Sequence, residues 1–364
     1  MSGAAKDIAG KVIRPEVQAM HAYPVADATG LVKLDLMESP YGLPPELAAE
    51  VGRIVSQLSL NRYPVPTAKR LRALIREVMQ VPTGCDVLLG NGSDECIQYI
   101  TAALAREGAV VMAPAPSFAM FSMHALFYRL RFIGVPLRQD FSLDTEAFLA
   151  AMAKEQPALV WLAFPNNPTG NAFPVADIER IIRAAPGLVV IDEAYQPFAG
   201  ATFMPRLAEF GNMVVMRTVS KIGMAGLRLG YVCGRPEWIE AFNKARSPFN
   251  INVVTEAVAI KLLENKKVLD DHAARVLAER ERLRPELERM PGLTVYPSVA
   301  NFFLARVRGP AGAGTRLFES LKAQGVLVRN FSGGLPSLEN CLRLTIGTPD
   351  ENRILIAALR EALK

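Results

Sequence analysis

Residues 158–170, ALVWLAFPNNPTG, join a continuous apolar run to a polar loop that contains two consecutive asparagines, Asn166 and Asn167. Continuous apolar runs of this length are typical of strands that are buried on both faces of a parallel sheet. Ligands of such sheets bind at the carboxyl ends of the strands. A turn explains the prolines and the glycine of the loop but not the paired asparagines, so the loop is read equally well as a turn or as a ligand contact.

Four more apolar runs of this kind alternate with segments whose apolar residues recur at helical spacing. This alternation predicts an α/β layered domain with a largely parallel sheet. The predicted strands are residues 87–89, 109–112, 158–164, 188–191 and 213–216. The predicted helices are residues 66–78, 94–106, 118–127, 144–154 and 176–184.

The sequence after about residue 250 changes character and predicts a second, smaller α+β domain. Residues 252–289 are rich in helix-forming side chains, with a break or kink expected at Pro285. The first 44 residues are expected to be irregular, because several prolines interrupt them. Strands are expected at 293–295, 302–307, 327–328 and 341–346, and a helix at 315–323. The predicted division is a large domain of residues 45–255 and a small domain of residues 1–44 and 256–364.

The composition excludes several classes of protein. Lys+Arg 41 against Asp+Glu 36 leave a net charge of only +5 without a long basic run, so nucleic acid is not an expected partner. No stretch reaches the roughly 18 apolar residues of a membrane helix, and the N-terminus lacks the apolar core of a signal peptide. The cysteines (Cys85, Cys96, Cys233 and Cys341) form no C-x-x-C pair, so a reduced cytoplasmic protein without a metal is expected.

Residues 90–95, GNGSDE, follow the strand predicted at 87–89 and precede a helix. Glycines allow a ligand to approach the backbone closely, and the first N–H groups of a helix can bind an anion. Gly92, Ser93 and Asp94 are therefore candidate phosphate contacts. Ser93 or Asp94 could also be an ordinary helix cap, which is the favoured interpretation of this motif taken alone.

Two acids, Asp192 and Glu193, leave the strand predicted at 188–191. Paired acids could bind a metal ion, but the three histidines, His21, His124 and His272, lie far apart in the sequence. One of the acids could instead face a cationic ring nitrogen.

Lys221 follows the strand predicted at 213–216 and its short extension. A lysine near the end of a buried strand is a candidate for a lowered pKa and a nucleophilic amine. Arg228, in the motif GLRLG, is placed where it could meet an anion, although a structural salt bridge explains it equally well.

Together these strand-end residues supply an amine, a carboxylate, a phenol, an amide and an anion site. Pyridoxal 5′-phosphate needs such a set for its aldehyde, its ring nitrogen, its ring oxygen and its phosphate. In order and spacing, NPTG at 167–170, DEAY at 192–195 and Ser220-Lys221 with Arg228 resemble the motifs of fold-type-I pyridoxal-phosphate-dependent aminotransferases. The resemblance spans nearly the whole chain, and it implies a large α/β domain with a mostly parallel sheet and a smaller α+β domain.

A narrower resemblance is to the histidinol-phosphate aminotransferases. It is carried by LDLMESPYG at 34–42, NRYP at 61–64, GSDE at 92–95 and CLRLTIG at 341–347. Two places depart from that family: MESP at 37–40 stands where Asn-Glu-Asn-Pro is usual, and Phe118 stands where the ring-stacking residue is usually tyrosine. Phenylalanine still stacks on a ring. The resemblance does not imply which contacts the loop with Met37 and Ser39 makes to the substrate.

The resemblance also implies a role for each residue. Lys221 would bind the cofactor aldehyde and move the substrate proton, and Asp192 would keep the ring nitrogen protonated. Phe118 would cover one face of the ring, while Tyr195 and Asn167 would bond to the ring oxygen. The implied phosphate contacts are Gly92, Ser93, Asp94, Ser220, Arg228 and, from the second subunit of a homodimer, Tyr63.

The implied reaction is transamination of L-histidinol phosphate with 2-oxoglutarate, which gives imidazole acetol phosphate and L-glutamate in histidine biosynthesis. Arg343 would take a substrate carboxylate, and Arg329 and Tyr23 would help to bind a phosphate monoester. Alternatives with the same cofactor are an aromatic or general amino-acid aminotransferase and a phospho-amino-acid decarboxylase. A non-catalytic binding protein of the same fold is a further alternative, which the presence of Lys221 disfavours.

Overall fold

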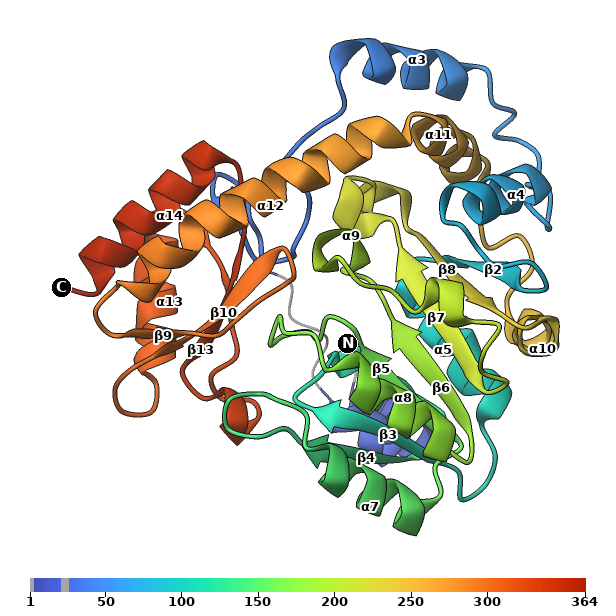
Figure 1. Ribbon diagram of the computed structural model, residues 1–364, viewed down its shortest axis with the longest axis horizontal. Helices are drawn as coiled ribbons and strands as arrows, with labels where there is room; N and C mark the ends of the chain where they lie inside the picture. The colour runs from blue at the N-terminus through green and yellow to red at the C-terminus, as the bar shows by residue number, and fades with distance from the viewer. Residues whose placement is uncertain (1–2, 21–25) are drawn as a thin grey trace.

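The larger of two structural units is built on a mixed sheet (Figure 1). The computed structural model describes residues 3–20 and 26–364, and within them this sheet has seven strands. In their order across the sheet they are β2 (Asp86–Asn91), β8 (Leu229–Gly234), β7 (Met213–Thr218), β6 (Leu188–Asp192), β5 (Leu159–Ala163), β3 (Val110–Ala115) and β4 (Arg131–Pro136). The pairs from β7 to β4 are all parallel, and β8 is antiparallel to both of its neighbours. The largely parallel sheet expected from the sequence is therefore confirmed.

The central strands are buried on both faces, which explains their continuous apolar sequences. In β5, Val160 and Leu162 pack into the core on one face of the sheet, and Leu159, Trp161 and Ala163 pack into the core on the other. Side chains alternate between the faces of a strand, so most residues of such a strand are apolar.

Two layers of helices cover the sheet (Figure 1). On the face of Trp161 lie α5 (Ser93–Leu104), α6 (Ala119–Phe127) and α10 (Pro236–Ala245). On the opposite face lie α3 (Pro45–Ser56), α4 (Lys69–Val78), α7 (Thr145–Glu155), α8 (Val175–Ala184) and α11 (Val253–Glu264). Among the residues that the structure describes, no helix is both long and apolar enough to cross a membrane.

The smaller unit is an antiparallel sheet packed against helices. Its strands, in order across the sheet, are β12 (Arg329–Asn330), β13 (Cys341–Thr345), β10 (Phe302–Val307) and β9 (Leu293–Val295). Its helices include α13 (Ala313–Ala323) and α14 (Pro349–Ala362). The N-terminal segment joins this unit through a parallel pair formed by β1 (Val32–Lys33) and β11 (Val326–Leu327).

One long helix, α12 (Lys266–Glu288), runs from the larger unit to the smaller one (Figure 1). Leu269 near its start belongs to the core of the larger unit, whereas Leu283 and Leu287 near its end are buried in the core of the smaller unit. The exact division of the chain between residues 255 and 256 stays a prediction.

Of the break or kink expected at Pro285, the break was wrong. α12 continues past Pro285 to Glu288, and the break falls instead at Asn265, between α11 and α12. Proline removes only one backbone N–H from the helix. Burial of Leu283 and Leu287 on either side of it holds the last turns in place.

The expectation that the first 44 residues are irregular was also wrong. They contain α1 (Gly3–Val12) and α2 (Pro15–Gln18). Pro15 does not prevent α2, because it is the first residue of that helix, where its missing N–H removes no helical hydrogen bond.

Replacing Leu162 by alanine is expected to lower the free energy of unfolding by about 3 kcal/mol, because a fully buried side chain of β5 would leave a cavity. Urea unfolding of the purified protein measures this loss. Ile354→Ala in α14 is the matched control, since Ile354 is 45% exposed, and it should cost no more than about 0.5 kcal/mol. Equal losses in the two variants would contradict burial of β5 on both faces.

Candidate active site

Parallel pairing brings three polar strand ends to one edge of the larger sheet. In the register of the sheet, Asp192 at the end of β6 lies opposite both Ala163 of β5 and Met216 of β7. The loops that follow these strands therefore begin side by side, at the edge where parallel sheets bind ligands. The functional side chains that follow the three strands are Asn167, Tyr195 and Lys221.

A hydrogen-bonded network connects this edge to the smaller unit. The side-chain amide of Asn167 donates to the Tyr195 hydroxyl at 3.1 Å. Arg343 Nη1, from β13 of the smaller unit, donates to Asn167 Oδ1 at 2.6 Å. Lys221 Nζ lies 5.8 Å from the centre of the Tyr195 ring. The amide, phenol, amine and guanidinium identified in the sequence therefore lie in one cluster.

Asp192 supplies a buried carboxyl group to the cluster. Its side chain is 6% exposed, and Oδ1 accepts a hydrogen bond from the N–H of Ala194 at 3.0 Å. Burial raises the pKa of Asp192 to about 7, while the bond from Ala194 and the charge of Lys221 act in the opposite direction. A carboxyl group in this state is stabilised as the anion when a cation comes beside it.

Lys221 lies directly after β7 and is partly buried, with Nζ donating to the backbone oxygen of Leu36 at 2.9 Å. Burial is the main cause that lowers the pKa of this amine from 10.5 to about 8, and the charges of Arg343 and Arg228 lower it as well. A lysine with this pKa has a substantial unprotonated fraction just above neutral pH, far more than an ordinary lysine has, so it can act as a nucleophile or as a base.

A cradle of backbone N–H groups lies at the start of α5. Gly92 stands in the N-cap position with a φ of +81°, and it makes no side-chain cap. A Cβ atom at Gly92 would lie 2.6 Å from Arg228 Nη2, and one at Gly230 would lie 2.5 Å from the backbone nitrogen of Ser93. Only glycine fits at these two positions, and the helix start and the guanidinium together form an anion site.

Neither Ser93 nor Asp94 caps this helix, which corrects the favoured interpretation of the motif taken alone. Ser93 is the first residue of α5, and Asp94 Oδ2 instead accepts a hydrogen bond from Arg228 Nη2 at 3.2 Å. The salt-bridge interpretation of Arg228 therefore holds in this structure. Both side chains are about half exposed, so an entering anion could replace the Asp94 carboxylate at small cost. Ser220 directly precedes Lys221 in the chain, and its Oγ lies 2.9 Å from Thr218 Oγ1.

Glu193, the second acid of the DEAY motif, belongs to a buried ion pair. Its Oε2 lies 2.7 Å from Arg217 Nη2, and both side chains are less than a tenth exposed. The carboxylate also accepts hydrogen bonds from the Thr202 hydroxyl and from the N–H of Phe203. Glu193 therefore secures the loop after β6, which leaves Asp192 as the acid available to a ligand.

Phe118 lies at the N-cap of α6, in the loop that follows β3. Its ring meets Phe121 edge to face, with ring centres 5.7 Å apart. The preceding residue, Ser117, donates to Asn166 Oδ1 at 2.8 Å. This bond ties the loop of Phe118 to the loop of Asn167.

The remaining predicted residues lie in different places. Tyr63 is 83% exposed and stacks on Phe249 with ring centres 4.9 Å apart, so the chain does not bring it into its own cluster. Arg329 in β12 is the cross-strand neighbour of Arg343 in β13. Tyr23 lies outside the described residues.

Backbone acceptors in the segment after β1 are the part of the cluster that the sequence analysis missed. The backbone oxygen of Asp35 accepts from Arg343 Nη2 at 2.8 Å, and that of Leu36 accepts from Lys221. Every residue has a backbone oxygen, so the sequence carries no residue-type signal for this role.

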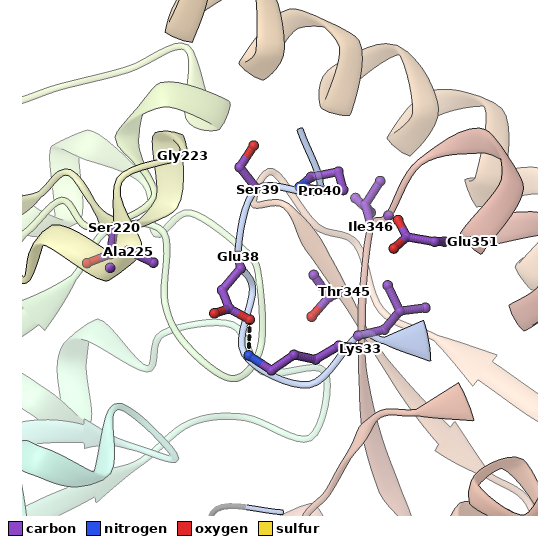
Figure 2. A pocket seen from close by; sticks show the side chains of 13 residues that line it. Lys33, Glu38, Ser39, Pro40, Ser220, Gly223, Ala225, Thr345, Ile346 and Glu351 are labelled. Carbon is purple, nitrogen blue, oxygen red and sulfur yellow. Dashed lines mark hydrogen bonds and ion pairs between the residues drawn. The ribbon is translucent and has the colours of Figure 1, made fainter. Parts of the chain in front are cut away.

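A pocket of about 370 Å³ lies between the loop after Lys221 and the end of β13 (Figure 2). Figure 2 shows two lining residues, Lys33 of β1 and Glu38 of the segment that follows β1, paired with each other. The two units thus meet around a hollow that is lined by Ser220, the residue before Lys221 in the chain. The polar and glycine residues that line it include Lys33, Glu38, Ser39, Ser220, Gly223 and Thr345.

The Lys221 amine is expected to titrate with a midpoint near pH 8 in the folded protein freed of carbonyl compounds, because burial disfavours its charged form. Trace labelling with acetic anhydride over a pH series, read from the Lys221 peptide by mass spectrometry, measures this midpoint. The urea-unfolded protein is the control, where the midpoint should return toward 10.5. Since the folded state binds fewer protons between these two values, the contribution of Lys221 to stability should increase with pH in that window. Equal midpoints in the two states would contradict a buried amine.

Comparison with known proteins assigns the chain to a family. The family model described as aminotransferase class I and II matches residues 29–359. Histidinol-phosphate aminotransferase 2 of Cupriavidus pinatubonensis is 55% identical over 97% of this chain and 97% of its own length, and histidinol-phosphate aminotransferase 1 of Ralstonia nicotianae is 53% identical over 98% and 96%. The crystal structure of histidinol-phosphate aminotransferase from Sinorhizobium meliloti, in complex with pyridoxal-5′-phosphate, has a TM-score of 0.86 at 25% identity and is matched over 97% of both chains. The chain has the fold-type-I architecture and belongs to the aminotransferase class I and II family.

Proposed function

We propose that this chain transfers the amino group of L-histidinol phosphate to 2-oxoglutarate, as a histidinol-phosphate aminotransferase of histidine biosynthesis. The products are imidazole acetol phosphate and L-glutamate. The observation that carries the proposal is the cluster of Asn167, Asp192, Tyr195, Lys221 and Arg343 at one edge of the sheet. The two relatives that are more than half identical over nearly the whole chain support the choice of substrate by their names.

The residues of the cluster fit pyridoxal 5′-phosphate. The buried carboxyl of Asp192 is suited to a cationic partner, and a protonated ring nitrogen is one. Gly92 and Gly230 leave backbone N–H groups open at the start of α5, where a phosphate can bind. When bound, the cofactor supplies an aldehyde for the Lys221 amine and a cationic ring that withdraws electrons from the reacting carbon.

The side chains around this position have separate tasks. Tyr195, whose hydroxyl is held by the Asn167 amide, is oriented to donate a hydrogen bond to the ring oxygen. Phe118, on the loop that is tied to Asn166 by Ser117, would cover a face of the bound ring. When its amine is free, Lys221 Nζ would accept the proton of the substrate carbon that bears the amino group, and it would then act as the acid that gives a proton back. A pKa of about 8 lets this amine accept and release a proton near neutral pH.

In this proposal, two arginines receive the substrate anion. Arg343 is 4% exposed and held between Asn167 and the backbone oxygen of Asp35, so its guanidinium has a fixed orientation. Arg329 is its neighbour on the adjacent strand. Planar guanidinium groups bind both carboxylates and phosphates, so one site can take glutamate and histidinol phosphate in turn. The proposal also includes Tyr23 as a contact of the substrate phosphate.

The functional unit in this proposal is a cytoplasmic homodimer. Tyr63 and Val65 are 83% and 63% exposed and line a groove of about 510 Å³ beside α11, a degree of apolar exposure typical of an interface. A second copy that covers this groove would carry Tyr63 to its partner's phosphate cradle. The cysteines of the described chain are buried and unbonded, which suits a reducing compartment.

A substrate panel tests the reaction. With cofactor, kcat/KM for histidinol phosphate and 2-oxoglutarate should exceed that for phenylalanine by about a hundredfold or more, because phenylalanine has no phosphate group to place between the two arginines. Initial-rate lines at fixed concentrations of the second substrate should be parallel, and O-phosphothreonine should release no CO₂. A preference for phenylalanine, converging lines or CO₂ release would each contradict the proposed reaction.

The Lys221→Ala variant tests the site itself. It should still bind the cofactor but carry no borohydride-reducible link, and its turnover should fall by about a thousandfold or more. Lys244→Ala, which removes a 75% exposed lysine of α10, is the matched control and should keep full turnover. If peptide mapping after borohydride treatment places the pyridoxyl label on another lysine, the assignment of Lys221 is wrong.

Mixing two variants tests the homodimer. Lys221→Ala and Tyr63→Ala are each expected to be impaired, because either change damages both sites of its own dimer. After subunit exchange in an equal mixture, half of the dimers are mixed, and each of these has one intact site. About a quarter of the wild-type activity should therefore return. No gain on mixing, with subunit exchange verified by mass, would show that Tyr63 does not act across subunits.

A further inference from the structure

A strained turn at Met37 lies next to the Lys221 amine. Met37 has a φ of +54°, in the left-handed region that residues other than glycine, asparagine and aspartate rarely adopt. Met37 is only 6% exposed, and its apolar side chain cannot form a hydrogen bond with the nearby backbone. Such a conformation persists only where the surroundings enforce it.

Two side chains of the smaller unit enforce the turn. Asn301 Nδ2 donates to the backbone oxygen of Met37 at 3.0 Å, and the hydroxyl of Thr345 accepts from the N–H of Met37 at 3.2 Å. Asn301 is 1% exposed, and its own backbone oxygen accepts from the N–H of Ile346 at 3.0 Å. Both backbone groups of Met37 are therefore held by fixed partners.

The turn aims two consecutive carbonyl groups at the two cationic groups of the cluster. The backbone oxygen of Asp35 accepts from Arg343 of the smaller unit, at 2.8 Å. The backbone oxygen of Leu36 accepts from Lys221 of the larger unit, at 2.9 Å. Hydrogen bonds from charged donors are short and strong, so the orientation of this backbone determines where both cations lie.

We propose that Asn301 is a positioning residue for the transamination reaction, because it holds the Met37 turn in the conformation that presents the Leu36 carbonyl to the free Lys221 amine. The inference rests on the proposed function for its catalytic meaning. In the stage of the reaction where the lysine is free, the carbonyl holds the amine at one place and favours its protonated form. Asn301 acts through the backbone and touches no reacting atom.

The bonding of Asn301 favours this role over simple packing. Its Oδ1 is buried without a hydrogen-bond partner in the described structure, while its amide nitrogen bonds to Met37. Buried polar groups of purely structural side chains are normally satisfied, and an unsatisfied one needs an explanation. The bond to the turn is that explanation, because an apolar residue of similar shape would fill the space but release the Met37 carbonyl.

The test measures the pKa of Lys221 in enzyme loaded with pyridoxamine phosphate, where the lysine is free. Trace labelling over a pH series should give a pKa about one unit lower in Asn301→Ala than in the wild type, because the charged amine loses its acceptor. The charges facing Lys221, from Arg343, Glu38, Asp94 and Arg228, are the same in both proteins. The kcat should fall about tenfold, with KM for glutamate changed less than about twofold.

Asn340→Ala is the matched control, since Asn340 is a buried asparagine of the same unit that bonds to the backbone of Gly309 and Pro310 instead. It should lower thermal stability without moving the Lys221 pKa. Thr345→Val, which removes the second contact to Met37, should also lower the Lys221 pKa. It replaces Asn301→Ala in the test if that variant does not fold.

A rescue experiment separates positioning from damage. Glycine adopts the left-handed turn without strain, so Met37→Gly in the Asn301→Ala background should restore most of the Lys221 pKa and of kcat. A Lys221 pKa that is unchanged in both Asn301→Ala and Thr345→Val, or that shifts equally in Asn340→Ala, would overturn the proposal. These outcomes do not depend on which amine is the substrate, so they are distinguishable from a failure of the proposed reaction.

Discussion

Burial of an amine and a carboxyl group at the same edge of one sheet is the constraint on which this molecule depends. Each group resists leaving water in its charged form, and so the pKa of Lys221 falls to about 8 while that of Asp192 rises to about 7. The parallel strands β5, β6 and β7 can hold these groups because their own side chains are packed on both faces. Because burial shifts their pKa values, both groups can change protonation near neutral pH. A ligand that places a cation beside Asp192 and an electrophile beside Lys221 stabilises both.

The second constraint is that the site belongs to both structural units. Arg343 comes from the antiparallel sheet, yet it bonds to Asn167 at the edge of the parallel sheet. The N-terminal segment passes between the units, and its backbone carbonyls contact a cation from each. A change in the conformation of this segment would therefore alter the hydrogen bonds of the amine and of the guanidinium together. In this way a strained backbone turn at Met37, which is far from the amine in sequence, orients the carbonyl group that the amine contacts.

Much of the fold could be predicted from the sequence, because continuous apolar runs and helical spacing report burial directly. The same reasoning failed where a local signal competed with packing: at Pro285, buried leucines on either side keep the helix intact. For the candidate site, Asp192 and Glu193 looked equivalent in the sequence. They differ in the structure because Arg217, 24 residues from Glu193, pairs with only that one. Ser93 and Asp94 likewise have the composition of a helix cap, but Arg228 takes the carboxylate and leaves the helix start open.

The sequence by itself determined the kinds of chemistry at the strand ends, since residue type and spacing place an amine, a carboxylate, a phenol and an amide after successive buried strands. Tertiary structure decided which of those groups meet and in what state. Proximity between Asn167 and Arg343, 176 residues apart, depends on how two sheets pack against each other, and no local pattern encodes it. The pKa values depend on burial, which is a property of the packed molecule. Backbone acceptors such as the Leu36 carbonyl are the extreme case, because every residue has one and only the fold selects which of them is used.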